Sequence, residues 1–195
     1  MEKTEFAYVT TIGSTDLGQA HFSFCKELGF FLCEQGFSIR SGKAPGADQA
    51  FQSGFENSLS AADYIRDPQI FLPWKTFERD NVFVSDRYDR YDYSPESIAK
   101  AEAIISTVHP VWDRLTDGQK RFHIRNVFQI LGEDVESPSA FLIACAPEDS
   151  EGLPKGGTRS AFKIARDRDI PCINIYDLSH QIVFDWLEKT MGSSR

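Results

Sequence analysis

Residues 37–51 read FSIRSGKAPGADQAF: a short apolar stretch, a loop with two glycines, and the beginning of a helix. The aromatic and β-branched residues at its start favour a strand. Glycine and proline in the middle are typical of a tight turn, and the helix is expected to continue to about Asn57. A strand that leads through a glycine turn directly into a helix is the repeating unit of an open parallel sheet.

The rest of the chain repeats this order. Further strands are predicted at 6–12, 69–73, 140–145 and 171–175, and further helices at 17–35, 156–167 and 179–191. The continuous apolar run at 140–145 is typical of a strand that is buried on both faces, so we place it at the sheet centre. The alternation predicts an α/β fold, a Rossmann-like open and mostly parallel sheet with helices on both faces.

The pattern changes between residues 75 and 137. A polar and aromatic stretch precedes two helical segments, of which the first begins at Ser94-Pro95-Glu96, with a capping side chain and a first-turn proline. The second helix is predicted from about Asp117 to Leu131. We interpret residues 75–137 as a helical insertion over the strand ends, within a single domain of residues 1–195.

Composition limits the possible functions. The chain has 195 residues and a net charge of −8, which argues against a protein whose main task is to coat duplex nucleic acid. No apolar stretch approaches the roughly 20 residues of a membrane span, and the first five residues lack the form of a signal peptide. We therefore expect a cytoplasmic protein without a membrane partner, located in the host cytoplasm if a phage encodes it.

The cysteines indicate neither a disulfide framework nor a metal site. They are Cys25, Cys33, Cys145 and Cys172, scattered through apolar or helical stretches without a CxxC pair. Reduced and mostly buried thiols are expected.

Three glycine loops each follow a predicted strand and precede a predicted helix, so they meet at one edge of the sheet. Glycine lets the backbone approach a phosphate, and the following helix offers unpaired amides. The loops predict an anion site. Their candidate ligand-binding residues are Gly13, Ser14, Arg40, Ser41, Gly42, Gly46, Ala47, Asp48, Lys155, Gly156, Gly157, Thr158 and Arg159.

Several candidates have a structural alternative. Asp48 is either a capping or first-turn acid of its helix or an acceptor for a ribose hydroxyl. Lys155 and Arg159 either belong to a solvated helix start or bind an anion, because cations at that end oppose the helix dipole.

The predicted helix from Asp117 to Leu131 supplies further candidates. Arg121 and Arg125 lie one turn apart and either clamp a phosphate or serve solubility. His123 alone is interpreted as structural. Trp74 either stacks on a base or belongs to the core.

Three segments resemble the SLOG superfamily, which unites DprA-type DNA-processing proteins with LOG-type nucleotide enzymes. Residues 41–48 look like its SGGAxGxD loop, and residues 156–161 look like its second glycine motif. His123-Ile124-Arg125-Asn126 is similar to the HxRK motif of LOG enzymes. The resemblance covers nearly the whole chain except about 75–94, and it is strongest to small phage proteins of the DprA-like type. It implies a nucleotide-type ligand, which places Asn126 among the candidates, and we also expect a homo-oligomer.

The second glycine motif departs from the enzymes at one position. LOG enzymes carry a catalytic glutamate where this chain has Ala161. The resemblance therefore favours binding without cleavage, with no assigned catalytic residue, metal or cofactor, although Glu151 or Asp48 could replace the missing carboxylate.

The leading hypothesis is a protein that captures an ADP-ribose-type or cyclic nucleotide signal, as a phage sponge against host defence signalling. One alternative is a LOG-like nucleoside 5′-monophosphate phosphoribohydrolase or another N-glycosidic hydrolase. The other is a DprA-like single-stranded DNA-binding recombination mediator, which the acidic charge disfavours.

Overall fold

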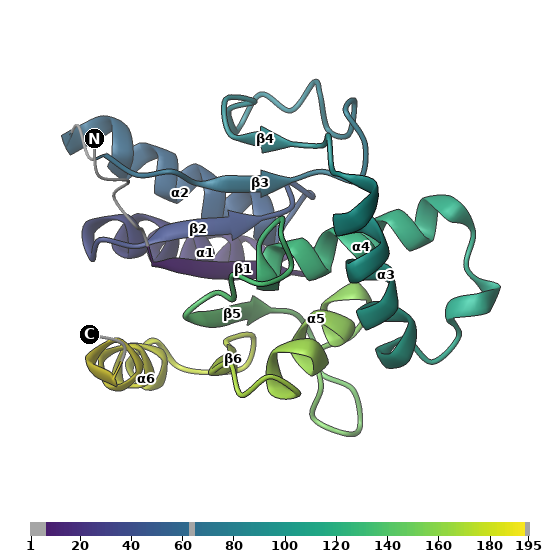
Figure 1. Cartoon of the computed structure of the whole chain (residues 1–195). Helices are drawn as coiled ribbons and strands as arrows, with labels where there is room; N and C mark the ends of the chain where they lie inside the picture. Colours follow the sequence, from purple (N-terminus) through teal and green to yellow (C-terminus); the bar gives the residue numbers. More distant parts are fainter. Residues whose placement is uncertain (1–6, 63–64, 194–195) are drawn as a thin grey trace.

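The computed structural model describes residues 7–62 and 65–193 and shows a six-stranded, all-parallel sheet in the order β4-β3-β2-β1-β5-β6 (Figure 1). The strands are β1 (Tyr8–Gly13), β2 (Ser38–Ser41), β3 (Gln69–Phe71), β4 (Asp89–Arg90), β5 (Phe141–Cys145) and β6 (Cys172–Asn174). The predicted α/β fold is confirmed. Residues 1–6, where the first strand was predicted to begin and where the absence of a signal peptide was noted, lie outside the described residues.

Helices cover both faces of the sheet. They are α1 (Gln19–Glu34), α2 (Ala47–Ala62), α3 (Pro95–Val108), α4 (Asp117–Leu131), α5 (Gly157–Arg166) and α6 (His180–Ser193), with one turn of 3-10 helix at Trp112–Arg114. Alternate residues of β5 divide between two apolar clusters. Phe141 and Ile143 pack with α1, α2 and α6, whereas Leu142 and Ala144 pack with α3, α4 and α5. This double burial explains the unbroken apolar run of β5, which lies second from the edge of the sheet.

Two glycines allow α1 and α2 to pack very closely. A Cβ atom added at Gly29 would overlap the carbonyl oxygen of Phe51, and one added at Gly54 would overlap the carbonyl oxygen of Lys26. Only a residue without a side chain fits at either crossing point.

The segment at 75–137 does more than cover the strand ends. It supplies β4, which pairs in parallel with β3 and was not predicted, because Asp89 and Arg90 carry no apolar signal. Helix α3 begins at the predicted cap, Ser94, and α4 begins at a Thr116–Gln119 capping box that was not predicted. The apolar side of α4 then packs directly on the sheet as part of one helical layer.

The strand order places a crevice at the middle of the sheet. From β1 the chain proceeds outward through β2, β3 and β4, and it later returns to the other side of β1 with β5 and β6. The loops that leave β1 and β5 therefore diverge at their carboxyl ends. Ligands of open α/β sheets gather at such a point, and the same edge carries the glycine loops.

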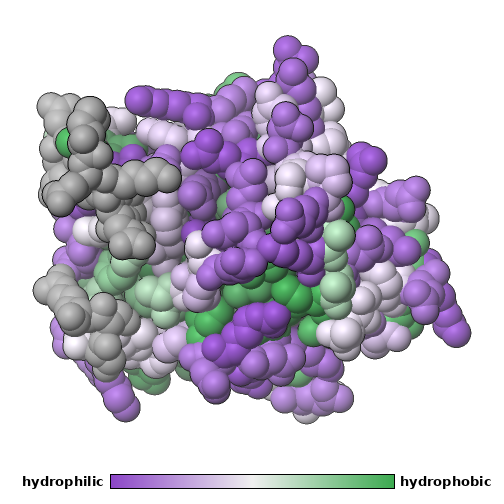
Figure 2. All heavy atoms as spheres, in the orientation of Figure 1, coloured by the Kyte–Doolittle hydropathy of each residue, from purple (hydrophilic) through white to green (hydrophobic). Residues whose placement is uncertain are grey.

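The surface and the thiols agree with the composition. The face in Figure 2 is mostly hydrophilic, with apolar residues exposed in the region of β5, β6 and α5. All four cysteines are free, and Cys25, Cys33 and Cys145 are buried. Within residues 7–62 and 65–193, no helix combines the length and apolar character that a membrane span requires.

We expect Gly54→Ala to destabilise the fold by about 3 kcal/mol, because the new methyl group must push α1 and α2 apart. Gly118→Ala is the matched control, since an added Cβ there meets no atom within 4 Å. That control should be neutral or stabilising by up to about 1 kcal/mol. Urea denaturation measures both free energies, and equal shifts in the two variants would contradict the tight crossing.

Candidate functional site

A cleft of about 370 Å³ opens at the carboxyl edge of the sheet. Gly13 and Thr15 line it from the end of β1 and Gly157 and Thr158 from the start of α5. The loop into α2 contributes Ala44, Pro45 and Asp48. Residues of α4 and of the segment after β3 complete the wall. Its volume falls within the range of small-molecule sites, roughly 300–1,000 Å³.

Six predicted ligand-binding residues line this cleft. They are Gly13, Asp48, Arg125, Asn126, Gly157 and Thr158. They come from four segments that lie far apart in the sequence. Their shared role as ligand contacts is a prediction.

Arg125 is the charged centre of the wall. The residue is 6% exposed, and its Nη1 donates to the carbonyl oxygen of Gly42 at 2.6 Å. Its Nη2 donates to Oδ1 of Asn126 at 3.2 Å, and Nη1 lies 3.9 Å from Oδ2 of Asp48. Burial lowers the pKa of Arg125, and the charge of Asp48 opposes that shift. The guanidinium thus joins α4 to the loop between β2 and α2.

Aromatic rings flank the same guanidinium. Its central carbon lies 5.9 Å from the ring centre of Phe77 and 5.7 Å from that of Phe122. Both distances are in the range of a cation–π contact. The buried Nε of Arg125 donates to no acceptor in the described part of the chain. A positively charged group with a remaining donor therefore stands in the wall of the cleft.

Asp48 is fully buried beside it. Its Oδ2 accepts a hydrogen bond from the amide of Ala44 at 3.4 Å, whereas Oδ1 has no donor among the described residues. Burial raises the pKa of Asp48 to about 6, although Arg125 and nearby backbone amides lower it. The carboxylate stabilises its own loop as a first-turn acid of α2, and the residue also lines the cleft.

The start of α5 forms the other side of the cleft. Gly156 adopts a left-handed backbone with φ of +68°, which turns the chain into the helix. Gly157 is exposed and Thr158 is buried against the cleft. First-turn amides have no partner within their own helix, and the helix dipole makes this end positive. The side chain of Asn126 donates to the carbonyl oxygen of Gly157 at 3.2 Å and fixes this turn against α4.

Five further predicted residues hold the loops without lining the cleft. The amide of Ala47 donates to the carbonyl oxygen of Ser14 at 3.0 Å. Gly46 has φ of +78°, and a Cβ atom there would overlap the same carbonyl oxygen. Ser41 and Gly42 are buried beneath the loop. These residues set the backbone geometry of the site.

Arg40 lies away from the cleft. Its guanidinium sits 4.2 Å from the ring centre of Tyr8 and donates to the side chain of Gln69 and the carbonyl oxygen of Ser137. Burial lowers the pKa of Arg40 to about 10. The side chain points to the α4 face of the sheet, where it ties β2 to the segment before β5.

The cations near α5 also lie outside the lining. Arg159 forms ion pairs with Asp149 and with Glu151 at 2.5 Å. These acids balance the positive charge at the helix start, so no ligand is needed to explain it. Lys155 and Gly156 are exposed beside them.

Trp74 and Arg121 line a neighbouring cleft instead. Trp74 packs against Phe77 and Phe122, with ring centres 5.5 Å and 5.1 Å apart. The predicted participation of Trp74 and Arg121 in ligand binding therefore concerns a second cleft, which Arg125 lines as well but Asp48 does not.

Some residues that line the cleft were not predicted as ligand-binding residues from the sequence. His123, interpreted as structural, lines the cleft, and burial lowers its pKa to about 4, so the ring is neutral. Glu78 and Gln119 also line it. Glu78 has φ of +50°, an uncommon conformation for a residue with a side chain. No local pattern marks these positions, since they reach the cleft only when their segments fold over it.

Lys43 explains how the segment after β3 is held. It adopts φ of +61° at a position where the resembling motif has glycine, and its side chain is fully buried. Its ammonium group bonds to Asp86 and, at 2.7 Å, to Asp89. This ion triad, in which the Lys43 side chain is fully buried and Asp86 is exposed, anchors the segment that carries Phe77 and Glu78.

Comparisons with known proteins give only distant likeness, in structure and not in sequence. No protein-family model matches the chain, and no curated protein matches it in sequence. The chain is distantly similar in structure to DNA processing protein A from Helicobacter pylori, which was studied for its single-stranded DNA binding mode. The identity is 12%, the TM-score is 0.39, and the match covers 94% of this chain and 80% of the other. Nothing about the cleft rests on this likeness.

The buried carboxyl predicts a pH-dependent stability difference. The folded pKa of Asp48, about 6, lies above its ordinary value of 3.8, so its stabilising contribution is present below pH 4 and is lost as the pH rises through 6. Asp48→Asn stays neutral at both pH values and loses the charge that pairs with Arg125, which adds a pH-independent cost. Relative to wild type, the variant should gain up to about 3 kcal/mol of stability between pH 4 and pH 7.5.

Urea denaturation at both pH values measures this difference. Asp16→Asn, at an exposed position, is the matched control. A constant difference between wild type and Asp48→Asn across this range would show that Asp48 does not carry the effect.

Proposed function

We propose that the chain binds a nucleotide-derived ligand in the cleft, with a phosphate at the start of α5 and a sugar hydroxyl at Asp48. One observation carries the proposal. A buried Asp48–Arg125 pair lines the cleft with one unused acceptor, Oδ1 of Asp48, and one unused donor, Nε of Arg125.

A buried polar atom without a hydrogen-bond partner lowers the stability of the fold. Buried polar atoms in native proteins nearly always have a partner, and each exception calls for an explanation. A ligand that offers both a hydroxyl donor and an anionic acceptor would satisfy Asp48 and Arg125 together. A ribose phosphate combines these two groups in one molecule.

The rest of the lining fits the same ligand class. The hydroxyl and first-turn amides at Gly157 and Thr158 suit a phosphate, whose charge is further favoured by the helix dipole. Phe77 and Phe122 add apolar ring surface for a base. The acids Asp48 and Glu78 offset the charge of Arg125, so amides rather than net charge would hold the phosphate.

Capture without cleavage remains the leading role. Ala161, which stands where the resembling enzymes have glutamate, is fully buried in the apolar cluster of α3, α4 and α5, and it does not line the cleft. A glutamate side chain there would displace core packing. The proposed role is a sponge that lowers the free concentration of a nucleotide signal, such as an ADP-ribose derivative.

One observation favours hydrolysis as a second candidate. The pKa of Asp48 is raised to about 6, which suits a group that exchanges protons near neutral pH. Cleavage of an N-glycosidic bond would use such a carboxyl to activate water. The third possibility, a single-stranded DNA binder, is disfavoured by the net charge of −8.

If the ligand binds at the start of α5, a bulky side chain at Gly157 should weaken its binding. A Cβ atom added at Gly157 has its nearest neighbour at 3.6 Å, the side-chain nitrogen of Asn126. Gly157→Leu should therefore fold normally and place its side chain in the phosphate site. We expect its affinity for AMP and ADP-ribose to fall by about 2 kcal/mol or more, the scale of lost charged hydrogen bonds.

Isothermal titration calorimetry measures this affinity. Gly118→Leu, on the exposed start of α4, is the matched control and should bind as wild type does. Unchanged affinity in Gly157→Leu would remove this helix end from the site.

Capture and hydrolysis differ in what becomes of the ligand. We expect nucleoside monophosphates and ADP-ribose to be recovered intact after incubation with excess ligand and denaturation, as chromatography would show. Multiple-turnover release of free base would reject the sponge and favour the hydrolase. Loss of that release in Asp48→Asn would then identify Asp48 as the catalytic carboxylate.

A further inference from the structure

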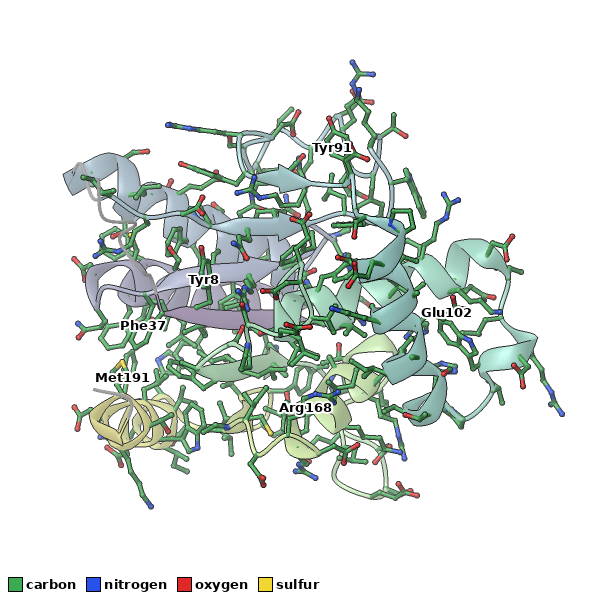
Figure 3. The ribbon with its side chains drawn as sticks, viewed as in Figure 1. Tyr8, Phe37, Tyr91, Glu102, Arg168 and Met191 are labelled. Carbon is green, nitrogen blue, oxygen red and sulfur yellow. The ribbon has the colours of Figure 1, made fainter. Side chains whose placement is uncertain are left out.

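A second cleft, of about 520 Å³, lies next to the first. Trp74 and Tyr91 line it from the segments around β3 and β4, Glu102 from α3, and Arg121 from α4. Figure 3 labels Tyr91 near β4 and Glu102 on α3, so two separate parts of the chain form its sides. Arg125 lines both clefts.

One aromatic cluster separates the two clefts. Trp74 lines the second cleft and packs against Phe77 and Phe122, which line the first. Arg125 stands at the same border, in contact with the rings of Phe77 and Phe122. The clefts are therefore neighbours across one wall of rings and share one guanidinium.

The aromatic side chains of the second cleft are not fully buried in the core. Trp74 is half-buried and Tyr91 is 41% exposed. Within residues 7–62 and 65–193, neither the indole N–H of Trp74 nor the hydroxyl of Tyr91 forms a hydrogen bond. The ammonium of Lys75 lies 5.6 Å from the ring centre of Tyr91. Accessible rings beside a cation are the surface on which nucleobases stack.

The charges of this cleft suit a nucleotide as well. Lys75, Lys120 and Arg121 line it, and none of them forms an ion pair with another described residue. Such cations are notable on a chain with a net charge of −8. The lining also contains the acids Asp92, Glu102 and Asp117, so its charges are mixed. Carboxylates accept hydrogen bonds from the exocyclic amino groups of bases.

We infer that the second cleft binds a second nucleobase, so that the ligand carries two bases joined through phosphate, with the linking phosphate beside Arg125. This inference rests on the proposed function of the first cleft. Arg125 lines both clefts, and its guanidinium is the positive group at their border. The ligand is either a free dinucleotide or two adjacent nucleotides of a single strand.

The affinity difference between one and two nucleotides tests the inference. Calorimetry compares each of the four nucleoside monophosphates with the corresponding 5′-phosphorylated dinucleotide. We expect the preferred dinucleotide to bind about tenfold more tightly or better, since stacking of one base on an aromatic side chain contributes on this scale. An octanucleotide of the same base distinguishes the two kinds of ligand. If the natural ligand is a single strand, the octanucleotide should bind more tightly than the dinucleotide. If it is a free dinucleotide, the octanucleotide should bind no more tightly.

Variants test whether the higher affinity of the dinucleotide comes from the second cleft. Tyr91→Ala combined with Arg121→Ala changes two exposed residues and should leave mononucleotide affinity unchanged, while the dinucleotide advantage falls to within about twofold. Arg114→Ala, exposed and outside both clefts, is the matched control and should keep the full advantage.

Three results would contradict the inference, and the third would also contradict the proposed function. Equal affinities of mononucleotide and dinucleotide, or an advantage that survives in the double variant, would reject the second base site and leave the first cleft intact. If no mononucleotide or dinucleotide binds the wild-type protein, the proposed function itself fails.

Discussion

The site depends on the burial of one positive charge, that of Arg125. A guanidinium removed from water must be compensated by acceptors and an opposite charge, or the fold loses several kcal/mol. Here the carbonyl oxygen of Gly42, the side chain of Asn126 and the carboxylate of Asp48 provide that compensation. They fix α4 against the loop between β2 and α2. The arrangement of the cleft follows from this requirement.

The compensation is incomplete in a way that suits binding. Asp48 and Arg125 each keep one hydrogen-bonding atom without a partner among the described residues, and the raised pKa of Asp48 reflects the cost of its burial. Apolar residues of similar volume would often give a more stable interior than a buried ion pair. Retention of the pair at a cleft wall is consistent with a ligand that supplies what the protein leaves unused.

A second buried cation holds the outer wall. Lys43 reaches Asp86 and Asp89 across the sheet edge and keeps the segment after β3 next to α2. That segment provides Phe77 to one cleft and Trp74 to the other. The positions of both aromatic surfaces thus depend on this ion triad.

The sequence by itself determined the order of strands and helices, because apolar periodicity, caps and glycine turns act within a few residues. It also identified Asp48, Arg125 and the start of α5 as candidates. Only the tertiary structure decided which candidates meet. Arg125 and Gly42 are 83 residues apart, whereas Arg159 is neutralised by acids of its own loop and Arg40 turns to the far side of the strand. The tertiary structure also decided the strand β4 and the positions of the wall residues Glu78 and His123. Their roles depend on which distant segment packs against them, and no local pattern encodes that contact.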